Sequence, residues 1–90
     1  MQLPVRIIVR QSKGIPAVRI NVECDCTYPF ETLIHPFIRV ANVAEEMEAM
    51  FVNQDFENED SKNNSVRFTV VFSNMEKSNK FCSILSLGGF

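Results

Sequence analysis

The chain has 90 residues, a mass of 10.3 kDa and 46% hydrophobic residues, which fits one small globular domain over residues 1–90. Nine basic and eleven acidic residues give a net charge of -2, whereas bulk nucleic-acid binding goes with a basic surplus. No apolar run approaches the ~20 residues of a membrane span, and the start lacks a signal-peptide pattern, so we expect an intracellular protein of the cytoplasm or nucleus.

Two segments of alternating polarity open the chain. Residues 5–10 alternate apolar positions with positions that are mostly arginine, and residues 18–23 alternate valine or isoleucine with polar side chains. Gly14 and Pro16 lie between them, where turn residues are expected. Because a strand turns successive side chains to opposite faces, this pattern predicts an antiparallel β-hairpin with one apolar face.

The spacing becomes helical after residue 27. Thr27 can cap a helix and Pro29 sits where its missing N–H costs little. Pro36, however, costs ~3 kcal/mol inside a helix. Residues 28–52 therefore fit one kinked helix, two helices with Pro36 opening the second, or a helix followed by a strand. The apolar stripe consists of Phe30, Leu33, Ile34, Phe37, Ile38 and Ala41.

The second half of the chain reads as an acidic loop and a second hairpin. Residues 53–65 are polar and acidic, and residues 66–72 alternate as a strand does. A polar turn over residues 73–79 precedes residues 81–87, which are apolar on both faces and predict a last strand. The order predicts an α+β fold: a small antiparallel or mixed sheet of about four strands, with one or two helices on one face (ββ-α-ββ).

This order resembles the ubiquitin-like β-grasp superfamily. The hairpin with its turn at Gly14 is followed by Thr27-Tyr28-Pro29-Phe30, which resembles the helix start of small ubiquitin-like modifiers. Residues 50–56 are similar to the strand and turn after that helix, and Leu87-Gly88-Gly89-Phe90 resembles an unprocessed modifier tail. The resemblance implies a β-grasp-like fold and a processing site at Gly88 and Gly89.

A second resemblance, ranked below the first, is to the RWD domains of protein-interaction scaffolds. Residues 18–29, ending in Tyr28-Pro29, precede Ile34-His35-Pro36 and an acidic helix, an order similar to that of RWD domains. RWD domains end on a helix, whereas a strand is expected here. Their loop also places the second proline closer than Pro36 stands to Pro29.

The chain carries no strong signature of an active site. Cys24, Cys26, Cys82 and His35 include zinc-ligand types, but their spacing matches no common zinc pattern. Cysteine side chains also pack as small hydrophobes, and no third group stands out to orient a cysteine–histidine pair. We therefore predict no catalytic residue, metal or cofactor, and a protein that is not an enzyme.

The outer faces of the predicted strands are the candidate binding surfaces. Arg6, Ile8, Arg10 and Arg19 share the outer face of the first hairpin, where an exposed isoleucine among arginines is typical of a docking patch. The alternative is a face merely covered by arginine stems. Ile84 lies in the two-faced last strand, which is either central or an edge for homodimer formation or partner binding by strand addition.

These features favour a non-catalytic protein-interaction domain. Its partner is expected to be another protein, docked through the sheet face or an edge strand of an adaptor, a complex subunit or an inhibitor. A virus- or phage-encoded inhibitor of a host protein fits equally. The alternative from another class is a ubiquitin-like covalent modifier processed after Gly89.

Overall fold

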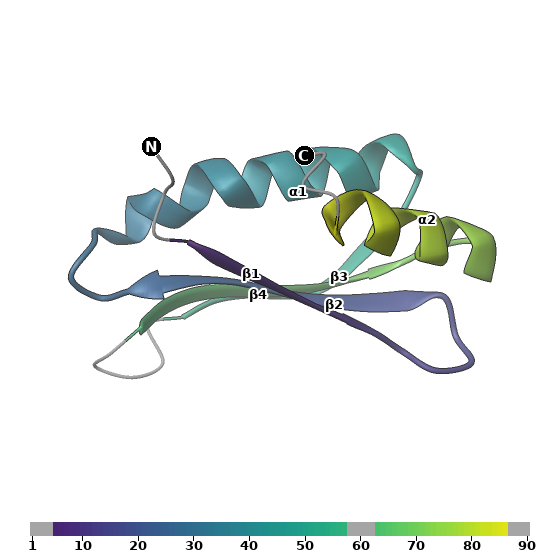
Figure 1. Cartoon of the computed structure of the whole chain (residues 1–90), viewed down its shortest axis with the longest axis horizontal. Coiled ribbons are helices and arrows are strands. Elements are labelled where there is room, and N and C mark those ends of the chain that lie inside the picture. The colour runs from purple at the N-terminus through teal and green to yellow at the C-terminus, as the bar shows by residue number, and fades with distance from the viewer. Residues whose placement is uncertain (1–4, 58–62, 87–90) are drawn as a thin grey trace.

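The computed structural model describes residues 5–57 and 63–86, which form a four-stranded antiparallel sheet with two α-helices (Figure 1). The strands lie in the order β1-β2-β4-β3, and α1 and α2 both lie on the same face of the sheet. The predicted α+β class and helix placement are therefore confirmed. In chain order the elements are β1 (Arg6–Gln11), β2 (Ala17–Asp25), the 3-10 turn η1 (Phe30–Leu33), α1 (Ile34–Glu46), β3 (Met50–Glu57), β4 (Asn63–Val71) and α2 (Met75–Ser86).

The first hairpin forms as its alternation predicts. β1 and β2 pair antiparallel, with Ile7 opposite Val22 and Val9 opposite Ile20. Val22 and Ile20 are fully buried, and Ile7 and Val9 are half-buried at the edge of the core. Gly14 turns the chain with a φ of 77°, a left-handed conformation that glycine adopts without steric cost.

The structure decides between the three arrangements predicted for residues 28–52. The chain first makes the turn η1, and α1 begins at Ile34, so Pro36 lies in the first helical turn, where its missing N–H breaks no hydrogen bond. The helix ends at Glu46, and β3 begins at Met50. A helix followed by a strand is therefore the correct alternative, because residues 50–52 belong to β3 and not to a helix.

The inner face of α1 differs in part from the predicted stripe. Leu33, Val40 and Ala44 are buried, whereas Ile34 and Ile38 are exposed. The helix thus turns its 33-36-40-44 positions to the sheet, a rotation that the apolar spacing alone did not distinguish. Aromatic packing joins the layers, because the ring of Phe37 stands edge-on to that of Phe68 with centroids 5.2 Å apart.

The predicted last strand over residues 81–87 is wrong, because Met75–Ser86 is the helix α2. The backbone N–H of Lys77 donates to Asn74 Oδ1 at 2.9 Å, which caps the start of the helix. Ser78, Phe81 and Leu85 are its buried residues, at spacings of three and four, so the segment has one apolar face rather than two. The fourth strand of the sheet is β3 instead.

This correction removes the basis for strand addition through the C-terminal segment. Ile84 is half-buried on a helix, so residues 81–86 offer no strand edge to a second copy or another partner. The sheet edges are β1 and β3. The helical end also removes one difference from RWD domains, although the distance from Pro29 to Pro36 remains.

Helix α2 packs against β1 on the same face of the sheet as α1, which we call the covered face. Gln11 Nε2 donates to Ser78 Oγ at 3.1 Å, which ties the end of β1 to the helix. The rings of Phe72 and Phe81 pack with centroids 5.1 Å apart. Over the described ranges 5–57 and 63–86, no helix is long and apolar enough to cross a membrane.

Candidate docking face on the open side of the sheet

One face of the sheet carries no helix. In the part of the chain that the structure describes, α1 and α2 both pack on the other face, as Figure 1 shows. We call the uncovered side the open face. Side chains alternate along each strand, so burying Val18, Ile20 and Val22 under the helices turns Arg19 and Asn21 to the open face.

A shallow hollow of about 190 Å³ lies on the open face. Strand pairing gathers its lining from three strands, because Ile8 pairs with Asn21 and Asn21 pairs in turn with Arg67. Arg10 pairs directly with Arg19 in the neighbouring row. The lining residues are Ile8, Arg10, Arg19, Asn21 and Arg67.

Three of the predicted docking residues meet in this hollow. Ile8, Arg10 and Arg19 line it together, whereas Arg6 lies further along β1 and does not. Arg6 Nε donates to Glu23 Oε1 at 3.1 Å, so this arginine is engaged in an ion pair. Its partner Glu23 also accepts a hydrogen bond from Asn21 Nδ2 at 3.2 Å.

Sequence reasoning missed two members of the hollow, Asn21 and Arg67. Asn21 was placed on the polar side of its strand, and its polarity was the only available signal. The alternation of residues 66–72 likewise puts Arg67 on the side opposite Val66 and Phe68. It does not predict that β4 pairs with β2. That pairing brings Arg67 beside Asn21.

Two positive charges of the hollow lie opposite each other on paired strands. Arg10 stands directly opposite Arg19, and like charges at opposed positions of an antiparallel pair are destabilising. Among the described residues, neither guanidinium forms an ion pair with a carboxylate. The pair therefore lowers the stability of the isolated domain, and an anion held between the two arginines would offset their repulsion.

Ile8 adds an apolar surface to the hollow, and Asn21 adds a buried amide. Asn21 Oδ1 is buried and accepts no hydrogen bond in the described structure. Such a group costs about 1–3 kcal/mol, and native proteins leave few of them. Ile8 is 37% exposed beside the arginines. The hollow thus combines cationic donors with an apolar edge, a set suited to binding an anion.

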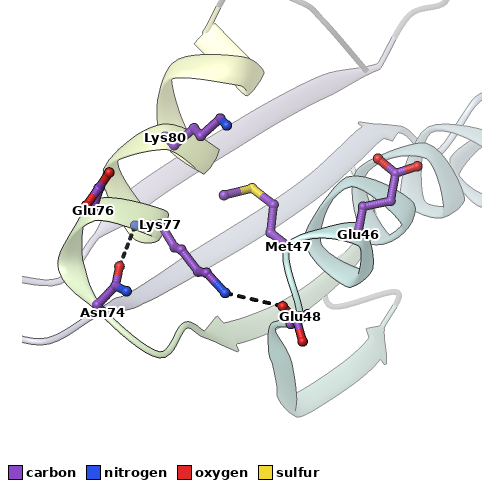
Figure 2. Close-up of a pocket in the computed structure, with 7 residues that line it drawn as sticks. All are labelled: Glu46, Met47, Glu48, Asn74, Glu76, Lys77 and Lys80. Atoms are coloured by element: carbon purple, nitrogen blue, oxygen red, sulfur yellow. Dashed lines mark hydrogen bonds and ion pairs between the residues drawn. The ribbon is translucent and has the colours of Figure 1, made fainter.

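A second hollow of about 400 Å³ lies between the end of α1 and the start of α2 (Figure 2). Lys77 Nζ crosses it to Glu48 Oε1 at 3.5 Å. Glu48 has a positive φ of 62°, and it lies in the turn after α1. The lining mixes three carboxylates with two lysines, and most of it is exposed, so it favours no single ligand chemistry. The lining residues are Glu46, Met47, Glu48, Asn74, Glu76, Lys77 and Lys80.

The cysteines and the histidine are spread over different surroundings. Cys24 is buried in the core, as a small hydrophobe would be, and burial raises its pKa although a hydrogen bond with Asn64 opposes the shift. Burial also raises the pKa of Cys82 on α2. Cys26 and His35 are exposed. Among the side chains that the structure describes, in residues 5–52 and 64–86, no three of histidine, cysteine or acidic type are grouped to hold a metal ion.

The remaining predicted site residues lie elsewhere. Ile84 belongs to α2, which packs on the covered face, so it does not join the arginines of the hollow. Gly88 and Gly89, the predicted processing site, lie outside the described residues. Leu85, three positions before Gly88, is buried against the core.

No protein-family model matches this chain, and no curated protein matches its sequence. Its function is therefore inferred from its own residues and their geometry.

Proposed function

We propose that this chain is a non-catalytic protein-interaction domain that docks through its open face on an acidic surface of a partner protein. The observation that carries the proposal is the opposed pair of Arg10 and Arg19, which have no ion pair with a carboxylate among the described residues. An acidic side chain of a partner would be attracted by both arginines, and this attraction would offset their repulsion. The domain would act as an adaptor, a complex subunit or an inhibitor, in the cytoplasm or the nucleus.

The composition of the open face supports docking on a protein. Arginine is enriched at interface hot spots, and its planar guanidinium binds a carboxylate through two parallel hydrogen bonds. Ile8 places an exposed apolar side chain among these cations. An interface that joins charged contacts to an apolar contact at its edge follows from this arrangement.

Matched variants on the two faces test the proposal. Tagged wild-type protein, Ile8→Asp, Arg10→Glu and Arg39→Glu are used to purify partners from native extract, after circular dichroism shows equal folding. Arg39 is exposed on α1, so its variant makes the same charge change on the covered side. We expect one partner to bind wild type and Arg39→Glu but neither open-face variant.

The purified partner then completes the test. A photo-crosslinking amino acid at position 8 should attach to an acidic segment of that partner, and the same group at position 39 should not. Retention of the partner by both open-face variants, or crosslinks only from position 39, would show that the open face is not the docking surface. An effect of the complex on the partner's activity would separate an inhibitor, including a viral or phage-encoded one, from an adaptor.

The β-grasp resemblance supplies the alternative function. A hairpin followed by a helix across an antiparallel sheet is compatible with a β-grasp-like domain. A covalent modifier would be processed after Gly89 and joined through the new carboxylate. A denaturing blot of the N-terminally tagged protein in native extract tests this. Heavier bands that resist reducing agent, with free protein lighter by the mass of Phe90, would support it.

A further inference from the structure

We infer that the hollow on the open face is a subsite for a phosphoryl group carried by a side chain of the partner protein. This inference rests on the proposed docking function and names the chemistry that the docking face recognises. The hollow is lined by arginines from three strands, with Arg10 on β1, Arg19 on β2 and Arg67 on β4.

The balance of charge favours a phosphoryl group over one carboxylate. Arg10 and Arg19 lack carboxylate partners in the described ranges. A phosphorylated side chain carries about -1.5 to -2 charges at neutral pH and three strong acceptor oxygens. It can accept hydrogen bonds from both arginines at once, whereas a single carboxylate would leave one positive charge uncompensated.

The size of the hollow favours one compact anion over a charged polymer. Its volume is about 190 Å³, less than half that of the hollow between α1 and α2. Three adjacent strands span only about 10 Å, since neighbouring strands lie ~4.8 Å apart. The chain's net charge of -2 and the carboxylate of Glu23, hydrogen-bonded to Asn21, disfavour a nucleic-acid backbone.

Ile8 fits a phosphorylated segment of a protein better than free phosphate. It offers an exposed apolar surface, beside the arginines, to a side chain next to the phosphorylated residue. A phosphorylated segment would thus use the cationic and apolar parts of the hollow together, whereas inorganic phosphate would use the cationic part alone.

Titration of the ¹⁵N-labelled full chain tests the inference. The probes are N-acetyl-O-phosphoserine amide, its unphosphorylated form, N-acetylglutamate amide, inorganic phosphate and a ten-residue oligothymidylate. We expect the phosphoserine probe to shift the amide signals of Ile8, Arg10, Arg19 and Asn21. It should bind more tightly than the glutamate probe by roughly tenfold, the loss expected when a charge-assisted hydrogen bond is missing. Inorganic phosphate should shift the same signals more weakly, and the unphosphorylated probe should shift none.

Substitutions localise the response. Arg10→Gln and Arg19→Gln should each weaken phosphoserine binding by roughly tenfold, and Arg39→Gln on the covered side should leave it unchanged. Equal weakening by all three variants would show non-specific attraction and overturn the subsite. Tighter binding of oligothymidylate than of phosphoserine would also overturn it and point to nucleic acid.

The two proposals fail in different ways. Equal binding of phosphoserine and glutamate at the hollow, or no response there to any probe, overturns the phosphoryl subsite. The docking function survives either result if Ile8→Asp still abolishes partner retention. If both Ile8→Asp and Arg10→Glu retain the partner, the docking proposal fails, whatever the probes do.

Discussion

Replacing Arg10 with glutamate should stabilise the free domain while abolishing docking. Arg10 faces Arg19 across the β1–β2 pair, so Arg10→Glu converts a repulsive pair into an attractive one. A surface selected only for stability would not keep two arginines in these positions. A gain in stability together with a loss of binding is therefore the signature of a functional arginine pair.

The expected magnitude follows from Coulomb's law. Opposed residues have Cβ atoms about 5 Å apart, and their longer side chains place the charges at roughly 7 Å, where two unit charges in water interact by about 0.6 kcal/mol. Physiological salt, with a Debye length of about 8 Å, reduces this to less than half. Arg10→Glu replaces the repulsion by an attraction of about the same size, so the free energy of unfolding changes by twice the interaction energy. The gain is about 0.5 kcal/mol at physiological salt and about 1 kcal/mol at low salt.

A double-mutant cycle isolates this interaction from strand propensity. Urea unfolding of wild type, Arg10→Glu, Arg19→Glu and the double variant gives four free energies of unfolding. Each single variant should gain stability, and the double variant should return close to wild type because two glutamates repel again. The coupling energy should grow as salt is lowered. Arg39→Glu serves as the single-charge control on the covered side.

A coupling energy of zero at both salt concentrations would refute the reasoning. The two guanidinium groups would then not act on each other, and the hollow would not hold a concentrated positive charge. A coupling of the predicted sign that does not change with salt would also contradict it, because exposed charges are screened.

Further outcomes concern the core, the turns and the thiols. Phe81→Ala should lower the free energy of unfolding by about 3–5 kcal/mol, because Phe81 is fully buried, whereas the exposed Met75→Ala should change it little in the same urea titration. Glu48→Gly should raise the unfolding midpoint, since its φ of 62° costs a non-glycine residue about 1–2 kcal/mol. Gly14→Ala, at a φ of 77°, should lower the free energy of unfolding by about 1 kcal/mol, although the added Cβ meets no other atom. Burial raises the pKa of Cys24, so the unfolded chain loses the thiol proton first, and stability should fall as pH rises above about 9. Replacing Cys24 with alanine should weaken that pH dependence, and an unchanged slope would show that other groups cause it.

Local patterns in the sequence were sufficient to predict secondary structure where the apolar residues follow a single period. Residues 5–10 and 18–23 alternate so regularly that the hairpin and its outward arginines follow from the two-residue period of a strand. Pro36 marked a helix start within the predicted alternatives. A short apolar run such as residues 81–87 fits a strand or a helix equally. Asn74, which accepts a hydrogen bond from the backbone N–H of Lys77, is a residue type that favours a helix start and was the sequence signal for α2.

Contacts between segments that are distant in the sequence decided where β3 lies and which side chains form the hollow. Residues 50–52 fit a helix or a strand by their sequence, and their pairing with β4 makes them a strand. Arg67 reaches the hollow because β4 pairs with β2, which is far away in the sequence. Alternation assigns each side chain to a face of its own strand, but the order of strands depends on which apolar faces pack together under the helices. The outward arginines were therefore readable from the chain, whereas the hollow that they form with Asn21 and Arg67 depends on the tertiary fold.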